Sequence, residues 1–183
     1  KEGKIFTTGV SINNLSLNEN DIGDFKTFLK LSPPLRTEND RKSLVNALND
    51  GTIDVIVSDH KPEDEESKRL TFSQAATGAT GVETLLPLAL ELFHNNSVKI
   101  EKLISTITSN PAKILGINKG SLEKGSDADI CVFDLNKPWI VNKGAFGQDW
   151  VGAYDYYTDL YHPIDMKSEQ IPLEKQQEYL TKK

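Results

Sequence analysis

The chain has 183 residues, of which 37% are apolar and 26% are charged, an ordinary balance for a globular protein. Its formal net charge of -6 argues against a nucleic-acid backbone as a partner. No apolar run approaches the length of a membrane span, so we expect no membrane association. The single cysteine, Cys131, excludes an internal disulfide and suits a reducing, cytoplasmic compartment. Cys131 lies in an apolar strand pattern, which predicts a buried and unreactive thiol.

The first part of the chain predicts a helix that leads into a buried strand. Residues 4–10 are a short strand candidate, because β-branched and aromatic side chains dominate there, and residues 11–24 are polar and predict a loop with one helical turn. Thr37-Glu-Asn-Asp40 has the form of a capping box, and Gly51 marks the helix end. The apolar run at 52–58 predicts a strand of a parallel sheet, buried on both faces.

The second part predicts three helices and then more strands. Asn110 is expected to cap the third helix, with Pro111 as its first residue. His94, at the end of the first, is expected to be a C-terminal cap partner and not a ligand. Leu122 is expected to be buried inside a turn. The expected elements are helices at 82–94, 100–108 and 112–115, and strands at 128–135 and 139–141.

Asp59 and His60 directly follow the predicted strand at 52–58. Barrel enzymes keep their chemistry at the carboxyl ends of parallel strands, so this carboxylate and imidazole are candidates for catalysis. An acidic loop follows them. Most of its charges are interpreted as solvated, but Glu63 lies nearest to the Asp-His pair and is a candidate site residue.

Two loops are candidates for ligand contact. Ser32 and Arg36 flank a pair of prolines that fix an extended, rigid loop, which either presents these side chains to a ligand or is only a stiff connector. Residues 75–81, Ala-Ala-Thr-Gly-Ala-Thr-Gly, are small, so their backbone can approach a ligand closely or pack against a helix.

Several motifs, taken in chain order, resemble the C-terminal part of dihydroorotases. These enzymes belong to the amidohydrolase superfamily, together with hydantoinases and allantoinases. The segment at 120–129 is similar to the start of the small β-domain of that superfamily. The motifs are Leu31-Ser-Pro-Pro-Leu-Arg36, Asp50-Gly-Thr-Ile-Asp54, Ser58-Asp-His60, Gly81-Val-Glu-Thr-Leu-Leu-Pro87 and Asn110-Pro-Ala-Lys-Ile-Leu-Gly116.

The resemblance implies an α/β fold, the C-terminal part of a (β/α)8 TIM-type barrel beside part of a small β-sandwich. Residues 1–117 would belong to the barrel and residues 118–142 to the β-domain, while the tail at 143–183 is not placed. The implied reaction belongs to pyrimidine biosynthesis: zinc-activated water opens the cyclic amide of dihydroorotate, or N-carbamoyl-aspartate closes in reverse. Zinc suits this chemistry because it lowers the pKa of bound water.

The resemblance also implies roles for single residues. Asp59 matches the last-strand aspartate, which is associated with the metal and acts as general acid and base. Ser32, Glu63, Thr77 and Gly78 match substrate-binding positions. Ser32 stands where many members have Asn, and Glu63 stands where many have a second His.

Other family features are missing from the chain. Asn13-Asn14 stands where many members carry a His pair, and the chain has only three His in all. The family also uses a His-x-His and a modified Lys, which we expect on strands before Lys1. Because zinc needs three or four ligands, we expect this chain to be inactive by itself.

Three functions remain open. The first is a dihydroorotase, and the second is a hydantoinase-type or allantoinase-type cyclic amidohydrolase. The third is a non-catalytic dihydroorotase-like subunit that scaffolds aspartate carbamoyltransferase. Self-association into a homo-oligomer is compatible with each, and an unrelated α/β domain would need many ordered motifs to coincide.

Overall fold

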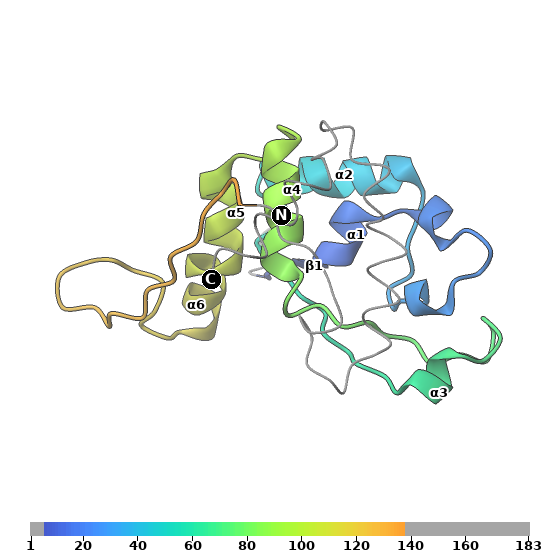
Figure 1. The fold of residues 1–183 in the computed structure, drawn as a ribbon. Helices are drawn as coiled ribbons and strands as arrows, with labels where there is room; N and C mark the ends of the chain where they lie inside the picture. The colour runs from blue at the N-terminus through green and yellow to red at the C-terminus, as the bar shows by residue number, and fades with distance from the viewer. Residues whose placement is uncertain (1–5, 138–183) are drawn as a thin grey trace, which may run out of the picture.

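The computed structural model describes residues 6–137, in which two short parallel strands are covered by helices (Figure 1). β1 (Gly9–Ser11) and β2 (Val55–Val57) pair with Val10 opposite Ile56. The expected strand at 52–58 therefore forms over a shorter range, but its expected burial on both faces is wrong, because the side chain of Val57 is exposed. The strand expected at 4–10 overlaps β1 only at its end, and positions 4 and 5 lie outside the described residues.

Helices contain far more of the described residues than strands do. In Figure 1, α4 runs through the middle, with α5 and α6 on one side and α1 and α2 on the other. None of the helices between residues 6 and 137 is long and apolar enough to cross a membrane. The bounds are α1 (Ile12–Ser16), 3-10 turns η1 (Glu19–Ile22) and η2 (Thr27–Leu29), α2 (Glu38–Asn49), α3 (Glu65–Lys68), α4 (Leu85–His94), α5 (Ile100–Ile107) and α6 (Ser109–Leu115).

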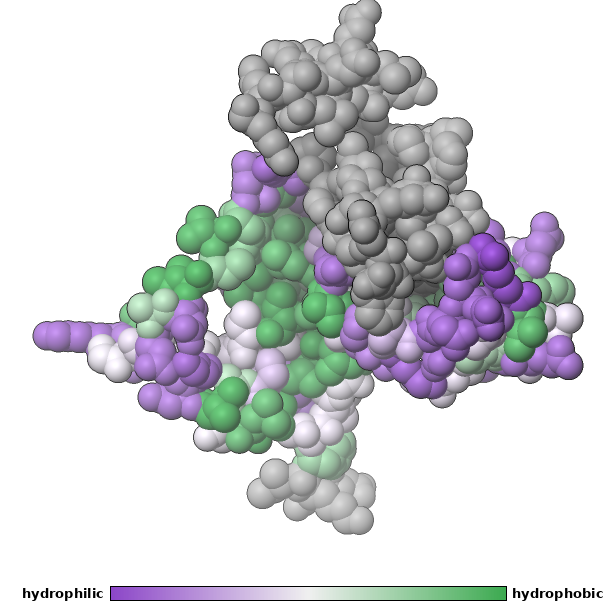
Figure 2. Space-filling view, turned by 60° about the horizontal axis from the view of Figure 1, so that its bottom comes forward, coloured by the Kyte–Doolittle hydropathy of each residue, from purple (hydrophilic) through white to green (hydrophobic). Residues whose placement is uncertain are grey.

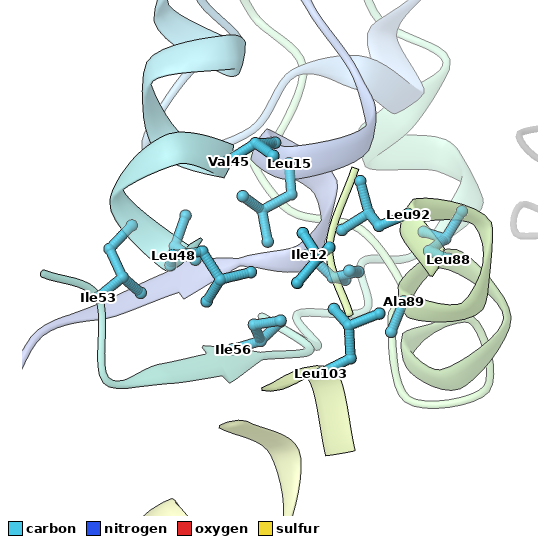
Figure 3. Packing of buried hydrophobic residues seen from close by; sticks show 12 residues of the cluster. Ile12, Leu15, Val45, Leu48, Ile53, Ile56, Leu88, Ala89, Leu92 and Leu103 are labelled. Atoms are coloured by element: carbon cyan, nitrogen blue, oxygen red, sulfur yellow. The ribbon is translucent and has the colours of Figure 1, made fainter. Parts of the chain in front are cut away.

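One apolar cluster joins the strands to the helices (Figure 3). Ile12 of α1, Leu48 of α2 and Leu103 of α5 are fully buried and meet beside the sheet. Burying a side chain of this size stabilises the fold by about 1.5–3 kcal/mol. The other members are Val10, Leu15, Val45, Ile53, Ile56, Leu88, Ala89, Leu92 and Val98.

The start of α2 follows the predicted capping box. Thr37 accepts a hydrogen bond from the Asp40 backbone N–H, and the Asp40 carboxylate accepts one from the Thr37 backbone. One turn on, Arg41 donates from Nε and Nη2 to the two oxygens of Glu38, both at 2.7 Å. Arg41 also donates to the carbonyl of Leu15, 2.9 Å away, so this ion pair fastens α2 to α1.

The expected cap of the third helix is wrong. α6 begins at Ser109, with Thr108 as its N-cap, so Asn110 already lies inside the helix. The amide of Asn110 instead donates to the carbonyl of Asp54, 2.8 Å away, which ties α6 to the residue before β2. His94 is the last residue of α4, and its Nε2 lies 2.8 Å from the carbonyl of Leu135.

The strand expected at 128–135 does not form. A strand needs a neighbour to satisfy its backbone groups, and no described segment pairs with this one. Cys131, expected to be buried, is exposed, and so is Leu122, whose exposed fraction is 89%. Figure 2 shows that exposed apolar side chains lie among hydrophilic ones on the face that it draws. The predicted elements at 139–141 and 143–183 lie outside the described residues, and the domain boundary after 117 stays a prediction.

The ion pair at the start of α2 predicts an acid-dependent part of the stability. The hydrogen bond from Arg41 lowers the pKa of Glu38 from 4.5 to about 2. A lowered folded-state pKa gives stability that is present above pH 4.5 and is lost as the pH falls toward 2. Replacing Glu38 with Gln should therefore lower the free energy of unfolding by about 1 kcal/mol at pH 7, and this difference should shrink on acidification.

Urea denaturation at several pH values measures this effect. Glu101→Gln, at an exposed position of α5, is the control and should stay within about 0.5 kcal/mol of the unchanged protein. A Glu38→Gln difference that does not change between pH 6 and pH 2 would contradict the assigned ion pair.

Candidate functional site

Asp59 lies two residues beyond the end of β2, half-buried, at the edge of the sheet where α1 also begins. Its backbone adopts φ +51°, a left-handed conformation that Asp and Asn tolerate better than most residues. The next residue, His60, forms a parallel bridge with Ala79. Lys61 N–H donates to the Ala79 carbonyl at 2.8 Å, so the segment after β2 is held against the loop at 75–81.

The ring of His60 holds the end of that loop. Its Nδ1 accepts from the backbone N–H of Gly81 at 3.1 Å and of Val82 at 3.4 Å. An acceptor at Nδ1 carries no proton, so the imidazole is used here as a structural acceptor. Gly81 allows the close packing, because a Cβ at this position would lie 2.2 Å from the Ser58 carbonyl oxygen.

Thr77 and Gly78 lie in the same loop and are fixed through their backbone. Gly78 N–H donates to the carbonyl of Lys30 at 3.0 Å, and the ammonium of Lys61 donates to the carbonyl of Thr77 at 2.6 Å. Gly78 has φ +144°, and a Cβ there would lie 2.5 Å from the Lys61 carbonyl oxygen. The small residues at 75–81 therefore let backbone approach backbone, and the expected approach to a ligand stays a prediction.

The loop at 32–36, called the proline loop here, is connected to this region by contacts of its own residues and their neighbours. Leu31, next to Ser32, is buried, while Ser32 itself is exposed. The Asn14 amide of α1 donates to the carbonyl of Pro34 at 3.2 Å, which ties the loop to the end of β1. Arg36 is also exposed, with its Nε 4.0 Å from the Asp40 carboxylate. Thus the segments around Ser32, Asp59 and Thr77 are brought together, and Arg36 points to α2.

Glu63 has a cationic partner. Its Oε1 lies 3.2 Å from the ammonium of Lys61, and about a quarter of its side chain is exposed. Since Lys61 also donates to the Thr77 carbonyl, Glu63 lies at the same site as Thr77 and Gly78. The positive charge of Lys61 partly compensates the negative charge of Glu63.

Asn13 is the least satisfied polar residue near this edge. Its exposed fraction is 1%, and neither its side-chain nitrogen nor its oxygen has a hydrogen-bond partner. Ser11 Oγ and Asn14 Oδ1 are likewise buried and unbonded. Buried polar atoms without partners are rare in folded proteins, and here they gather at the carboxyl end of β1.

Two lysines of this region were missed by sequence reasoning. Lys68 has an exposed fraction of only 4%, and Lys30 is half-buried. Burial lowers the pKa of Lys68 to about 8; Glu63 opposes this shift, while Lys61 and Lys30 add to it. Lysines in polar loops give no sequence signal of burial, because the same pattern is typical of solvated surface.

The described residues do not fit a zinc ion by themselves. No group of three His, Cys, Asp or Glu side chains within residues 6–137 is arranged to hold a metal. Asp59 is one carboxylate, whereas a zinc site needs three or four ligands. The expected role of Asp59 as a metal ligand therefore stays a prediction.

The close contact at Gly81 predicts a strict requirement for glycine. Gly81→Ala would place a methyl group against the Ser58 carbonyl and force the backbone beside Asp59 to move. We expect a loss of about 2 kcal/mol or more in unfolding free energy, measured by urea denaturation. Ser73→Ala, exposed in the preceding segment, is the control and should change it by less than about 0.5 kcal/mol. Equal stability of the Gly81→Ala variant and the unchanged protein would refute this packing.

Comparison with known proteins shows which enzymes the chain resembles. The chain is 41% identical to the dihydroorotase of Ehrlichia canis over 141 residues, which are 77% of this chain and 32% of that protein. It is 44% identical to the dihydroorotase of Acetivibrio thermocellus over 124 residues, 67% of this chain and 29% of that protein. The chain thus spans about a third of the length of these curated relatives.

A solved structure gives the same architecture. L-hydantoinase from Arthrobacter aurescens superposes with a TM-score of 0.63 at 30% identity, over 67% of this chain and 28% of that chain. The expected fold class, an α/β part of a barrel hydrolase, and the resemblance to dihydroorotases are confirmed. The model of the amidohydrolase family matches residues 10–162. A match over most of the sequence, joined to this fold, shows that the chain belongs to the amidohydrolase family.

Proposed function

We propose that this chain is the C-terminal part of a dihydroorotase, which interconverts dihydroorotate and N-carbamoyl-aspartate in pyrimidine biosynthesis. The observation that carries the proposal is the meeting of Asp59 with the loops of Ser32, Glu63 and Thr77 at the carboxyl end of β2. Identity near 40% to dihydroorotases supports the substrate class. A hydantoinase-type reaction is less well supported, because the identity to L-hydantoinase is 30%.

In this proposal Asp59 moves the proton. Water adds its hydroxyl to the ring carbonyl, the carbon–nitrogen bond breaks, and the proton goes to the leaving nitrogen. A half-buried carboxylate at the strand end is suited to take the proton from water and pass it on. The backbone at Thr77 and Gly78 and the hydroxyl of Ser32 would bind the polar groups of the ring.

The metal of this proposal is zinc, with Asp59 as one ligand. The other ligands would have to come from polypeptide outside residues 6–137, because that range holds no three-ligand cluster. We therefore propose that residues 6–137 alone have no activity. Supplying the missing ligands would complete the site.

A second candidate function is a non-catalytic subunit that scaffolds aspartate carbamoyltransferase. It is favoured by the amides at Asn13 and Asn14, since an amide is a poorer zinc ligand than an imidazole. Elemental analysis of the intact polypeptide separates the two. Bound zinc with turnover of dihydroorotate supports the enzyme, whereas a metal-free, inactive protein that binds aspartate carbamoyltransferase supports the scaffold.

Asp59→Asn tests the catalytic role most cleanly. Asn tolerates the φ of +51° at this position, so the fold should be kept while the proton-carrying group is lost. We expect kcat for dihydroorotate to fall by about 10²–10⁴ in the intact polypeptide. Asp24→Asn, an exposed residue, is the control and should leave kcat unchanged. Substantial turnover by Asp59→Asn would end this assignment.

Glu63→His tests the charge at the substrate side. The carboxylate repels an anionic substrate even though Lys61 lies 3.2 Å away, so its removal should lower KM. We expect KM for dihydroorotate to fall about 3- to 10-fold, as a change of about 1 kcal/mol in binding implies. Glu66→His, exposed on α3, is the matched control. An unchanged KM in the Glu63 variant would count against this role.

A further inference from the structure

The loop at 75–81 needs support from outside itself. It contains no helix or strand, and its residues are Ala, Thr and Gly, which offer few side-chain contacts. Within it, Ala76 N–H donates to the carbonyl of Ser67 at 3.1 Å. Three of its carbonyls accept from lysine ammonium groups of other segments. These are the carbonyls of Ala75, Ala76 and Thr77, bonded to Lys30, Lys68 and Lys61 in that order, and of these lysines Lys68 is buried and Lys30 is half-buried.

Lys68 is the first of them. From the end of α3, its Nζ donates to the carbonyl of Ala76 at 2.9 Å and to the carbonyl of Thr27 at 3.2 Å. Thr27 Oγ1 donates back to the Lys68 carbonyl. One buried lysine therefore joins the end of α3, the start of η2 and the 75–81 loop.

Lys30 is the second of these lysines, and it extends from the segment before the proline loop to the residues around Ala75. Its Nζ donates to the carbonyls of Ala75 at 2.7 Å and Ser73 at 3.0 Å, and lies 5.8 Å from the ring centroid of Phe72. Its own carbonyl accepts from Gly78 N–H at 3.0 Å. Because Lys30 is two residues before Ser32, this contact sets the distance between the proline loop and the 75–81 loop.

An ammonium group is costly to bury, so its burial needs a compensating gain. The ammonium offers three donors, and carbonyls take at least two of them on each lysine. Methionine would fill a similar volume without donors and would leave the same carbonyls unbonded. A leucine or methionine at either place would thus lose the side-chain bonds to the loop, and the backbone bond between Gly78 N–H and the Lys30 carbonyl would have to hold the loop without them.

We propose that Lys30 and Lys68 form a clamp, the two-lysine clamp, which holds Thr77 and Gly78 in register with Ser32 and so positions the substrate-binding loop. The clamp rests on the proposed function for its effect on substrate. Its structural part, the order of residues 75–81, does not depend on that function. Lys30 and Lys68 are positioning residues, because they act on the substrate through the loop.

Hydrogen exchange in the intact polypeptide tests the clamp directly. Lys68→Met and Lys30→Met should each speed exchange of the Ala76 and Gly78 amides by at least about 10-fold. Amides of the core, such as Leu88 and Leu103, should keep their rates, which shows that the protein stays folded. Lys42→Met, exposed on α2, is the matched control. Unchanged exchange at Ala76 and Gly78 would overturn the clamp.

The titration of the Lys68 ammonium gives a second readout. The buried group should titrate near its pKa of about 8 in the unchanged protein, followed by nitrogen NMR of lysine side chains. The facing charged groups are Glu63, Lys61 and Lys30. Removing the charge of Lys30 should raise the pKa of Lys68 toward its ordinary value. A Lys68 pKa that does not change in the Lys30 variant would place the two ammonium groups apart and overturn the clamp.

Kinetics decide whether the clamp serves substrate binding. In Lys68→Met we expect KM for dihydroorotate to rise at least about 5-fold, with kcat changed less than about 2-fold. Faster loop exchange with an unchanged KM would reduce the lysines to a structural role and overturn the positioning proposal. Absence of dihydroorotase turnover in the unchanged polypeptide would contradict the proposed function, and the exchange and titration results would then decide the clamp alone.

Discussion

β1 and β2 pair in parallel, and Val10 and Ile56 stand opposite each other in the buried cluster. This pairing fixes both the direction and the register of two segments about 45 residues apart in the sequence. Because the direction is parallel, the segments that leave β1 and β2 emerge at the same edge. The end of β1 continues into α1, and the end of β2 leads to Asp59. The register between the two strands therefore positions α1 and Asp59 relative to each other at the candidate site.

The register of the two strands is maintained because one face of the strand pair is buried in the apolar cluster. Ile12 follows β1 directly and is fully buried together with Leu48 and Leu103. A slip of one residue would turn the strand side chains to the opposite face and would remove Ile56 from the cluster. The Asn110 amide, bonded to the carbonyl of Asp54, adds a polar contact at the other end of β2. Packing from three helices therefore fixes the position of Asp59 more than the short ladder does.

Local signals of the sequence were the reliable ones. Thr37 and Asp40 predict the start of α2 correctly, because both hydrogen bonds of a capping box form within four residues. The strand before Asp59 was also predicted, although it is shorter than expected. Features that depend on distant partners were not: Asn110 bonds to a carbonyl far back in the chain, and residues 128–135 have strand composition but no described neighbour to pair with.

The lysines show the same limit. Nothing within a few residues of Lys68 distinguishes it from an ordinary surface lysine, because its partners lie at Thr27 and Ala76.

The net charge beside the 75–81 loop also depends on contacts between residues that are distant in the sequence. Lys61 spans Glu63 and the Thr77 carbonyl, so the acidic run predicted from composition carries less net negative charge at the loop than its sequence implies. The Thr77 carbonyl holds the Lys61 ammonium beside the Glu63 carboxylate, which offsets part of its negative charge. Lys61 therefore links the loop geometry to the local charge, because one ammonium group contacts both the Thr77 carbonyl and the Glu63 carboxylate.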